Sequence, residues 1–163
     1  VTITEASRIG KPGDAFAAME KVNDKAVLGV SAEAVGVLET LLQKTVEYSK
    51  TRKQFGTVIG TFQALQHRMA DMFIECQLAR SIVVMAAMKL DSSADQREKT
   101  KAVSAAKSRV GKAIRSVSQE AVQIHGGIGV TNELDVGHYF KRATALEIMF
   151  GNTDYHVERF ASL

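Results

Sequence analysis

The position of proline constrains this 163-residue chain more than any other feature, because proline occurs only once, at Pro12. Proline interrupts helices, so helices of many turns are permitted everywhere after that residue. Before it, Val1–Thr4 alternates like a strand but is too short to form a sheet alone. The chain also lacks an initiating methionine. We therefore expect residues 1–13 to be the end of a preceding part of the protein, in a fragment, a processed product or an expressed segment.

Apolar residues at helical spacing predict two long helices in the first half of the chain. The first extends from about Asp14 to Arg52 or Lys53, and the second from Phe62 to Leu90. Their apolar seams are Val27, Val30, Ala34, Val37, Leu41 and Tyr48, and then Phe62, Leu65, Met69, Met72, Cys76, Ala79, Val83, Ala86 and Leu90. The second seam alternates steps of three and four, which is typical of helix bundles. Residues 54–61 contain two glycines and β-branched residues, which predicts a structured loop.

A third long helix is predicted to start at Ser92 and Asp95, which together resemble a capping box. Its seam is formed by Val103, Ala106, Val110, Ala113, Val117 and Ile124. Shorter helices are expected from Thr131 to about Ile148 and from Asp154 to Phe160, the last capped by Asn152 or Thr153. The predicted fold is therefore all-α, an antiparallel bundle of about four helices over residues 14–163.

The net charge of +3 is small, and basic residues are dispersed among acidic ones, which gives no indication of nucleic-acid binding. No apolar run approaches the ~20 residues that cross a bilayer, and no signal peptide begins the chain. We predict no membrane span and a cytoplasmic location.

The single cysteine, Cys76, excludes an intramolecular disulfide, and its place in an apolar helical row favours core packing over nucleophilic chemistry. The four histidines lack the spacing of a metal site, so no metal is predicted. No pair of carboxylates indicates a glycosidase or an aspartic protease. The methionines expected to fill gaps in the core are Met69, Met72, Met85 and Met88.

Two features are candidates for ligand binding. The stretch Gln123–Gly129 reads Gln-Ile-His-Gly-Gly-Ile-Gly, and such glycines either cap a helix or expose backbone amides to a phosphate. Arg52 and Arg142 can each grip a phosphate through two parallel hydrogen bonds, although most surface arginines do not. The residues alone leave both alternatives open.

Residues 48–56 read Tyr-Ser-Lys-Thr-Arg-Lys-Gln-Phe-Gly, and Phe-Gln at 62–63 and Met-Ala-Asp-Met at 69–72 follow. This resembles the C-terminal helical domain of the acyl-CoA dehydrogenases, whose pattern is Tyr-x-x-x-Arg-x-x-Phe-Gly, then Phe-Gln, then Ala-Asp-Met. The glycine stretch matches the Gln-x-x-Gly-Gly-x-Gly of the same family at the expected distance. The resemblance covers roughly residues 14–163 and implies that residues 1–13 end a middle β-domain.

Members of that family usually assemble as tetramers that hold FAD across a subunit interface. The resemblance implies that Arg52 contacts the FAD pyrophosphate of a neighbouring subunit, and that Gln123, Gly126 and Gly127 complete the site from another subunit. The other residues expected to surround the dinucleotide are Gln54, Phe55, Ile59, Phe62 and Gln63.

The family reaction removes a proton from the α carbon of an acyl-CoA thioester while a hydride leaves the β carbon, so a carboxylate must lie beside the α carbon. Register with the family places Phe150 and Ala26 at the two known positions of this base, and neither accepts a proton. Asp24 and Glu147 are the nearest acids. The ending Phe150–His156 resembles partner subunits of bacterial heteromeric acyl-CoA dehydrogenases, in which a companion chain can supply the base.

Three hypotheses follow from the sequence. The first is an FAD-binding subunit without its own base, in a dimer or tetramer that acts on acyl-CoA. The second is an active homo-oligomer whose base is Asp24 or Glu147. The third is a non-catalytic helical oligomerisation module that has lost FAD.

Overall fold

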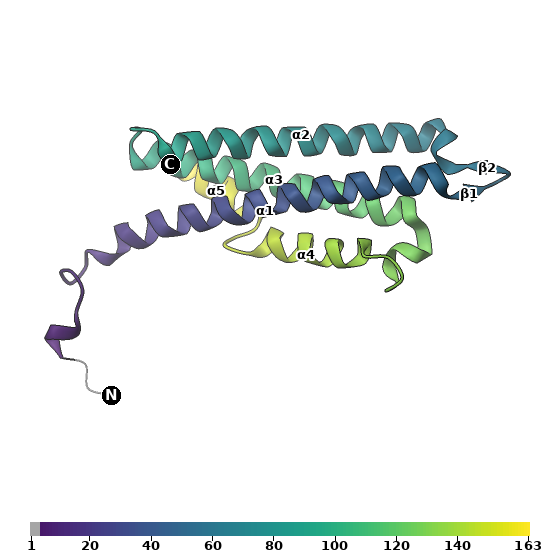
Figure 1. The fold of residues 1–163 in the computed structure, drawn as a ribbon. Coiled ribbons are helices and arrows are strands. Elements are labelled where there is room, and N and C mark those ends of the chain that lie inside the picture. The colour runs from purple at the N-terminus through teal and green to yellow at the C-terminus, as the bar shows by residue number, and fades with distance from the viewer. Residues whose placement is uncertain (1–3) are drawn as a thin grey trace.

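The computed structural model describes residues 4–163, which form an up-and-down helical bundle (Figure 1). In chain order, the elements are η1 (Glu5–Ser7), α1 (Ala15–Thr51), β1 (Lys53–Gln54), β2 (Thr57–Val58), η2 (Ile59–Thr61), α2 (Gln63–Asp91), α3 (Gln96–His125), η3 (Gly126–Val130), α4 (Val136–Ile148) and α5 (Thr153–Ser162). The η elements are short 3-10 helices. The predicted all-α bundle is confirmed.

Helix α3 is the centre of the bundle, since it packs against α1, α2, α4 and α5. Its buried face is rich in alanine and valine, which allows the neighbouring helices to approach closely. Helices α1 and α3 run in one direction and α2 runs in the other (Figure 1). The carboxyl ends of α1 and α3 therefore meet the amino end of α2 at one end of the bundle.

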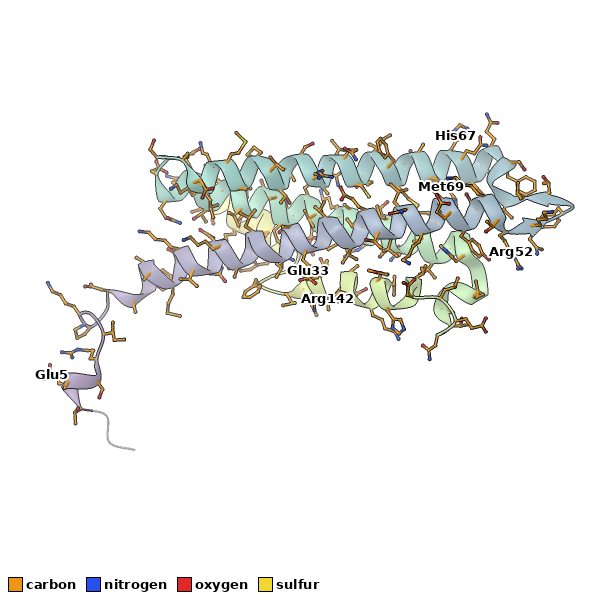
Figure 2. All side chains as sticks on the ribbon, in the orientation of Figure 1. Glu5, Glu33, Arg52, His67, Met69 and Arg142 are labelled. Atoms are coloured by element: carbon orange, nitrogen blue, oxygen red, sulfur yellow. The ribbon has the colours of Figure 1, made fainter. Side chains whose placement is uncertain are left out.

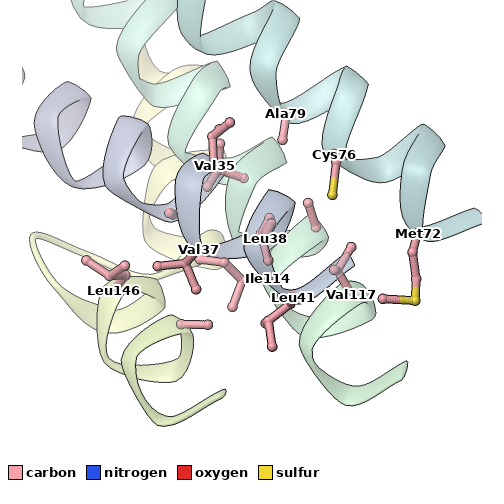
Figure 3. Packing of buried hydrophobic residues seen from close by; sticks show 14 of the residues in the cluster. Val35, Val37, Leu38, Leu41, Met72, Cys76, Ala79, Ile114, Val117 and Leu146 are labelled. Carbon is pink, nitrogen blue, oxygen red and sulfur yellow. The ribbon is translucent and has the colours of Figure 1, made fainter. Parts of the chain in front are cut away.

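Most residues of the three predicted apolar seams lie in the core, as Figure 3 shows for Leu41 of α1 and Met72 of α2. Leu38 of α1, outside the predicted seam, packs with them. Cys76 lies in this core with 1% of its surface exposed, and burial raises the pKa of its thiol to about 12. The prediction that Cys76 packs in the core is confirmed. Met85 and Met88 are exposed instead, because α2 has a second apolar face that points away from α1 and α3.

Two predicted helix starts are wrong, and one is confirmed. Asp95 itself caps α3, since its carboxylate accepts a hydrogen bond from Glu98 N–H at 2.8 Å, whereas Ser92 follows the end of α2. The helix predicted from Thr131 begins five residues later, because η3 and a turn precede it. Asn152 caps α5 by accepting from Tyr155 N–H at 3.0 Å, as predicted.

The first turns of α1 extend beyond the bundle and expose Phe16, Met19 and Val22 (Figure 1). The strand expected over Val1–Thr4 lies almost wholly outside the described residues, and η1 follows it. By length and composition α1 could cross a membrane. Its middle is nevertheless buried against the rest of the bundle, as in the core helix of a packed domain.

Candidate functional site

One cleft at the end of the bundle, where α1 and α3 terminate, gathers most of the residues predicted to surround a cofactor. Its volume is about 450 Å³. Eight of the nine predicted residues line it: Arg52, Gln54, Phe55, Ile59, Phe62, Gln123, Gly126 and Gly127. The ninth, Gln63, is the exposed first residue of α2 and does not line this cleft. We call this space the terminal cleft.

Arg52 follows the last turn of α1, where its N–H donates to Tyr48 O at 2.9 Å. Within residues 4–163, no carboxylate forms an ion pair with its exposed guanidinium (Figure 2). Arg142 differs, because Glu33 holds it through two bonds of 2.6 and 2.9 Å. Of the two candidate arginines, Arg52 is therefore the one available to an anion.

A tight hairpin follows Arg52 and carries an aromatic side chain to its tip. Strands β1 and β2 pair at Lys53 with Val58, and both turn residues, Phe55 and Gly56, have positive φ (56° and 83°). This is the type I′ geometry of two-residue hairpins. A left-handed phenylalanine is strained by about 1–3 kcal/mol, and such strain clusters at functional sites. Phe55 is 92% exposed. Its ring and the ring of Phe62 lie edge to face, with their centroids 6.2 Å apart.

The glycine stretch both ends α3 and opens the terminal cleft. Gly126 has φ of 68°, and its N–H donates to Gln123 O and Val122 O as a helix cap. For Gly126 the capping alternative therefore holds, since its amide is engaged within α3. A Cβ at Gly127 would meet no atom within 4 Å. Packing within the chain thus does not require glycine at 127, and the space beside it is open.

Both stretches line one cleft of a single chain, whereas the resemblance implies that they act from different subunits. The reason is the common direction of α1 and α3, which brings their carboxyl ends together (Figure 1). Helix carboxyl ends carry partial negative charge and disfavour anions. The groups that favour an anion in the cleft are therefore the amino end of α2, which reaches it at Phe62, and the side chains of Arg52 and Arg68.

Sequence reasoning missed several residues of the terminal cleft. They are Tyr48, Leu65, Arg68, Ile124, His125 and Ile128. Arg68 lies three residues after Leu65, on the same side of α2, and this spacing is the signal that could have found it. Its guanidinium is 3.2 Å from the Glu120 carboxylate, a charge contact without hydrogen-bond geometry.

The turn between α4 and α5 holds Phe150, at the first of the two expected base positions. Phe150 has φ of 58°, and its side chain is 45% exposed. Lys107, itself buried, donates to the carbonyls of Leu146 and Glu147 at 2.8 and 2.7 Å and so fixes the end of α4. His156 Nε2 donates to Phe150 O at 3.0 Å, since a carbonyl can only accept. The turn is thus held rigidly although it presents no acid.

The two acids proposed as replacement bases have structural partners. Asp24 is 1% exposed and accepts bonds from Arg159 at 2.8 Å and from Thr100 at 2.7 Å. Glu147 accepts from the amide and the hydroxyl of Thr153 at 3.2 and 3.0 Å, which joins the end of α4 to the start of α5. Both carboxylates therefore hold helices together.

The buried imidazole of His156 makes folding stability depend on pH. Burial lowers its pKa, against the opposing effect of the hydrogen bond to the Phe150 carbonyl. Between the usual histidine pKa of about 6.5 and the lowered one, the unfolded chain binds a proton that the folded chain does not, so stability is lost as pH falls. We expect the urea midpoint to decrease from pH 7 to pH 5.

The variant His156→Gln, which keeps a donor toward Phe150 O but cannot titrate, should reduce this dependence. The remainder comes from His125, because burial lowers its pKa as well. The exposed His67→Gln is the control and should leave it unchanged. Equal pH slopes for the wild type and His156→Gln would contradict the assignment.

Among residues 4–163, no three His, Cys, Asp or Glu side chains are grouped to hold a metal ion. The terminal cleft itself is lined by guanidinium groups, amides and aromatic rings.

Comparison with known proteins adds four similarities. A family profile described as "Acyl-CoA dehydrogenase, C-terminal domain" matches residues 16–162. Acyl-CoA dehydrogenase IpdE2 of Mycolicibacterium smegmatis is 45% identical over 120 residues, which cover 74% of this chain and 36% of that protein. The structure of butyryl-CoA dehydrogenase from Megasphaera elsdenii matches with a TM-score of 0.87 at 31% identity, over 94% of this chain and 39% of the other.

The ChsE4-ChsE5 complex from Mycobacterium tuberculosis matches with a TM-score of 0.85 at 30% identity, over 98% of this chain and 42% of the other. The chain thus spans about two fifths of the length of these relatives.

Proposed function

Because this chain belongs to the acyl-CoA dehydrogenase family, as its C-terminal helical domain, we propose that it supplies one half of an FAD site in a longer flavoprotein. Members of the family are FAD-dependent oxidoreductases. The observation that carries the proposal is the gathering of eight predicted cofactor residues in the terminal cleft. Residues 1–13 would then end the β-domain of the longer protein, and its substrate would be an acyl-CoA thioester.

The side chains of the terminal cleft fit the dinucleotide part of FAD. A pyrophosphate carries two negative charges, and two guanidiniums, those of Arg52 and Arg68, line the cleft. The open space beside Gly127 lets backbone approach a phosphate oxygen. Phe55 and Phe62 offer ring surface to the nucleoside. When bound, the flavin accepts the hydride that leaves the substrate.

We infer further that this chain does not remove the substrate proton. Phe150 and Ala26 occupy the base positions, and neither has an ionisable side chain. Asp24 is buried in an ion pair, and Glu147 is bound by Thr153. These contacts weigh against a relocated base and favour a partner subunit as its source. The ChsE4-ChsE5 relative is a complex of two different chains.

The outward face of α2 supports assembly into a dimer or tetramer. Ile74, Leu78, Met85 and Met88 lie there at steps of four, seven and three, and each is at least 44% exposed. A row of large apolar side chains on a surface marks an interface. A cytoplasmic location stays a prediction.

Replacing Arg52 by alanine tests the FAD half-site directly. Loss of charge-assisted hydrogen bonds to a phosphate costs about 1.5–3 kcal/mol, so we expect FAD to bind roughly 10- to 100-fold more weakly. The measurement is the dissociation constant of FAD for the full-length protein, coexpressed with its partner, together with flavin absorbance per subunit.

The matched control is Arg142→Ala. The Arg142 guanidinium pairs with Glu33, so its removal should leave FAD affinity unchanged. Unaltered flavin content in Arg52→Ala would contradict the proposal that the terminal cleft is half of an FAD site. A full-length protein that binds no flavin at all would instead favour the oligomerisation module.

A further inference from the structure

The two halves of the terminal cleft are joined by a contact between Tyr48 of α1 and His125 of α3. Their rings stack with centroids 4.3 Å apart and planes inclined by 27°. The Tyr48 hydroxyl also donates to His125 O at 3.4 Å. These residues are 77 positions apart in the sequence, so the contact fixes one segment against the other.

Each partner is tied to one half of the binding elements. Tyr48 O accepts the N–H of Arg52 at 2.9 Å, which sets where the arginine leaves α1. His125 directly precedes Gly126, and its Nδ1 lies 2.7 Å from Ala121 O, which fixes the ring against its own helix. A Cβ at Gly129 would lie 2.9 Å from His125 Cβ, so the glycine turn folds back onto this histidine.

The Tyr48–His125 pair also separates two clefts. Both residues line the terminal cleft and a second cleft of about 510 Å³, which is bounded by Lys44, Asp135 and Tyr139 on its other side. His125 is 5% exposed, and Tyr48 is half-buried. Smaller side chains at these positions would merge the two spaces and leave Arg52 without a fixed distance to the glycine turn.

We propose that Tyr48 and His125 are positioning residues that hold the Arg52 guanidinium and the Gly126–Gly127 turn at the separation a diphosphate requires. The inference rests on the proposed FAD half-site and adds the element that assembles it. Neither side chain needs to touch the phosphates. Binding is tighter when the binding groups are already in place, because less order must be created on association.

The test is FAD affinity of the full-length protein with Tyr48→Leu or His125→Leu, measured beside thermal melting. Loss of the aromatic stack should weaken FAD binding about tenfold. Tyr48→Phe keeps the stack and should restore affinity to within about threefold of the wild type. Tyr139→Leu is the matched control, since this half-buried tyrosine lines only the second cleft; its FAD affinity should not change.

A merely structural role is distinguished by combining Tyr48→Leu with Arg52→Ala. If Tyr48 acts by positioning Arg52, its replacement should change affinity less than twofold once the guanidinium is gone. An undiminished tenfold effect in that background overturns the proposal, as does wild-type affinity in Tyr48→Leu. If Tyr48→Leu does not fold, the same comparison is made with His125→Leu, which removes the stack from the other side. If Arg52→Ala retains wild-type affinity for FAD, the result would instead contradict the proposed FAD half-site itself.

Discussion

Replacing Phe150 with glutamate is expected to raise acyl-CoA dehydrogenation by the full-length protein on its own about 10²- to 10⁴-fold, the usual contribution of a general base. The turn that would carry the new carboxylate is already rigid. Lys107 fixes its start through the carbonyls of Leu146 and Glu147, and His156 holds Phe150 O. Glutamate adds no new backbone strain, because phenylalanine already occupies the left-handed conformation there.

The measurement is reduction of an artificial electron acceptor by acyl-CoA, with FAD present and without the partner subunit. Ile148→Glu is the matched control, because it places a carboxylate two residues earlier, on the exposed side of α4, and should give no gain. Normal turnover by the unmodified protein alone would show that a base is present after all. No gain in a folded Phe150→Glu that binds FAD would show that position 150 does not face the substrate.

Replacing Arg159 with methionine is expected to lower the free energy of unfolding by about 3–5 kcal/mol, since it leaves the carboxylate of Asp24 buried without a countercharge. Asp24 is 1% exposed, and the 2.8 Å bond from Arg159 joins α5 to α1. Thr100 and Gln96 also donate to this carboxylate, at 2.7 and 3.1 Å, but they carry no charge. Methionine keeps most of the hydrocarbon part of arginine, so the decrease in the free energy of unfolding comes mainly from the missing positive charge.

Urea unfolding followed by circular dichroism measures this loss. Adding Asp24→Asn to Arg159→Met should recover part of it, because the uncompensated charge is then removed. Arg142→Ala, which breaks the exposed pair with Glu33, should leave the free energy of unfolding almost unchanged. A loss below about 1 kcal/mol in Arg159→Met would mean that water reaches Asp24.

The long helices were predictable because their apolar spacing is regular over many turns, and most seam residues of α1, α2 and α3 are buried as expected. The half-buried exceptions are Tyr48, Phe62, Leu65, Met69 and Leu90. The exposure of Met85 and Met88 was not predictable, because α2 carries apolar residues on two faces and periodicity does not say which face is inside. The start of α4 was missed because the residues of η3 and the turn after it have no distinctive spacing.

The content of the terminal cleft was largely predictable from motif register, which identified eight of its lining residues. Its assembly was not. Arg52 and Gly127 line the same cleft because α1 and α3 run in the same direction, and no local sequence pattern encodes that direction. His125 was part of the quoted glycine motif, yet its contact with Tyr48 requires the tertiary structure. For the same reason the sequence left open whether Asp24 is a base, and it gave no sign of the ion pair with Arg159.

The hairpin tip at Phe55 has a consequence for how fast and how firmly another surface could bind there. Its left-handed backbone is a cost of folding, of about 1–3 kcal/mol, rather than a cost of association. A hairpin backbone that is already fixed loses little further conformational entropy when the tip is covered. Encounters with a complementary pocket would then need no loop rearrangement, and the association rate would be limited by diffusion and orientation.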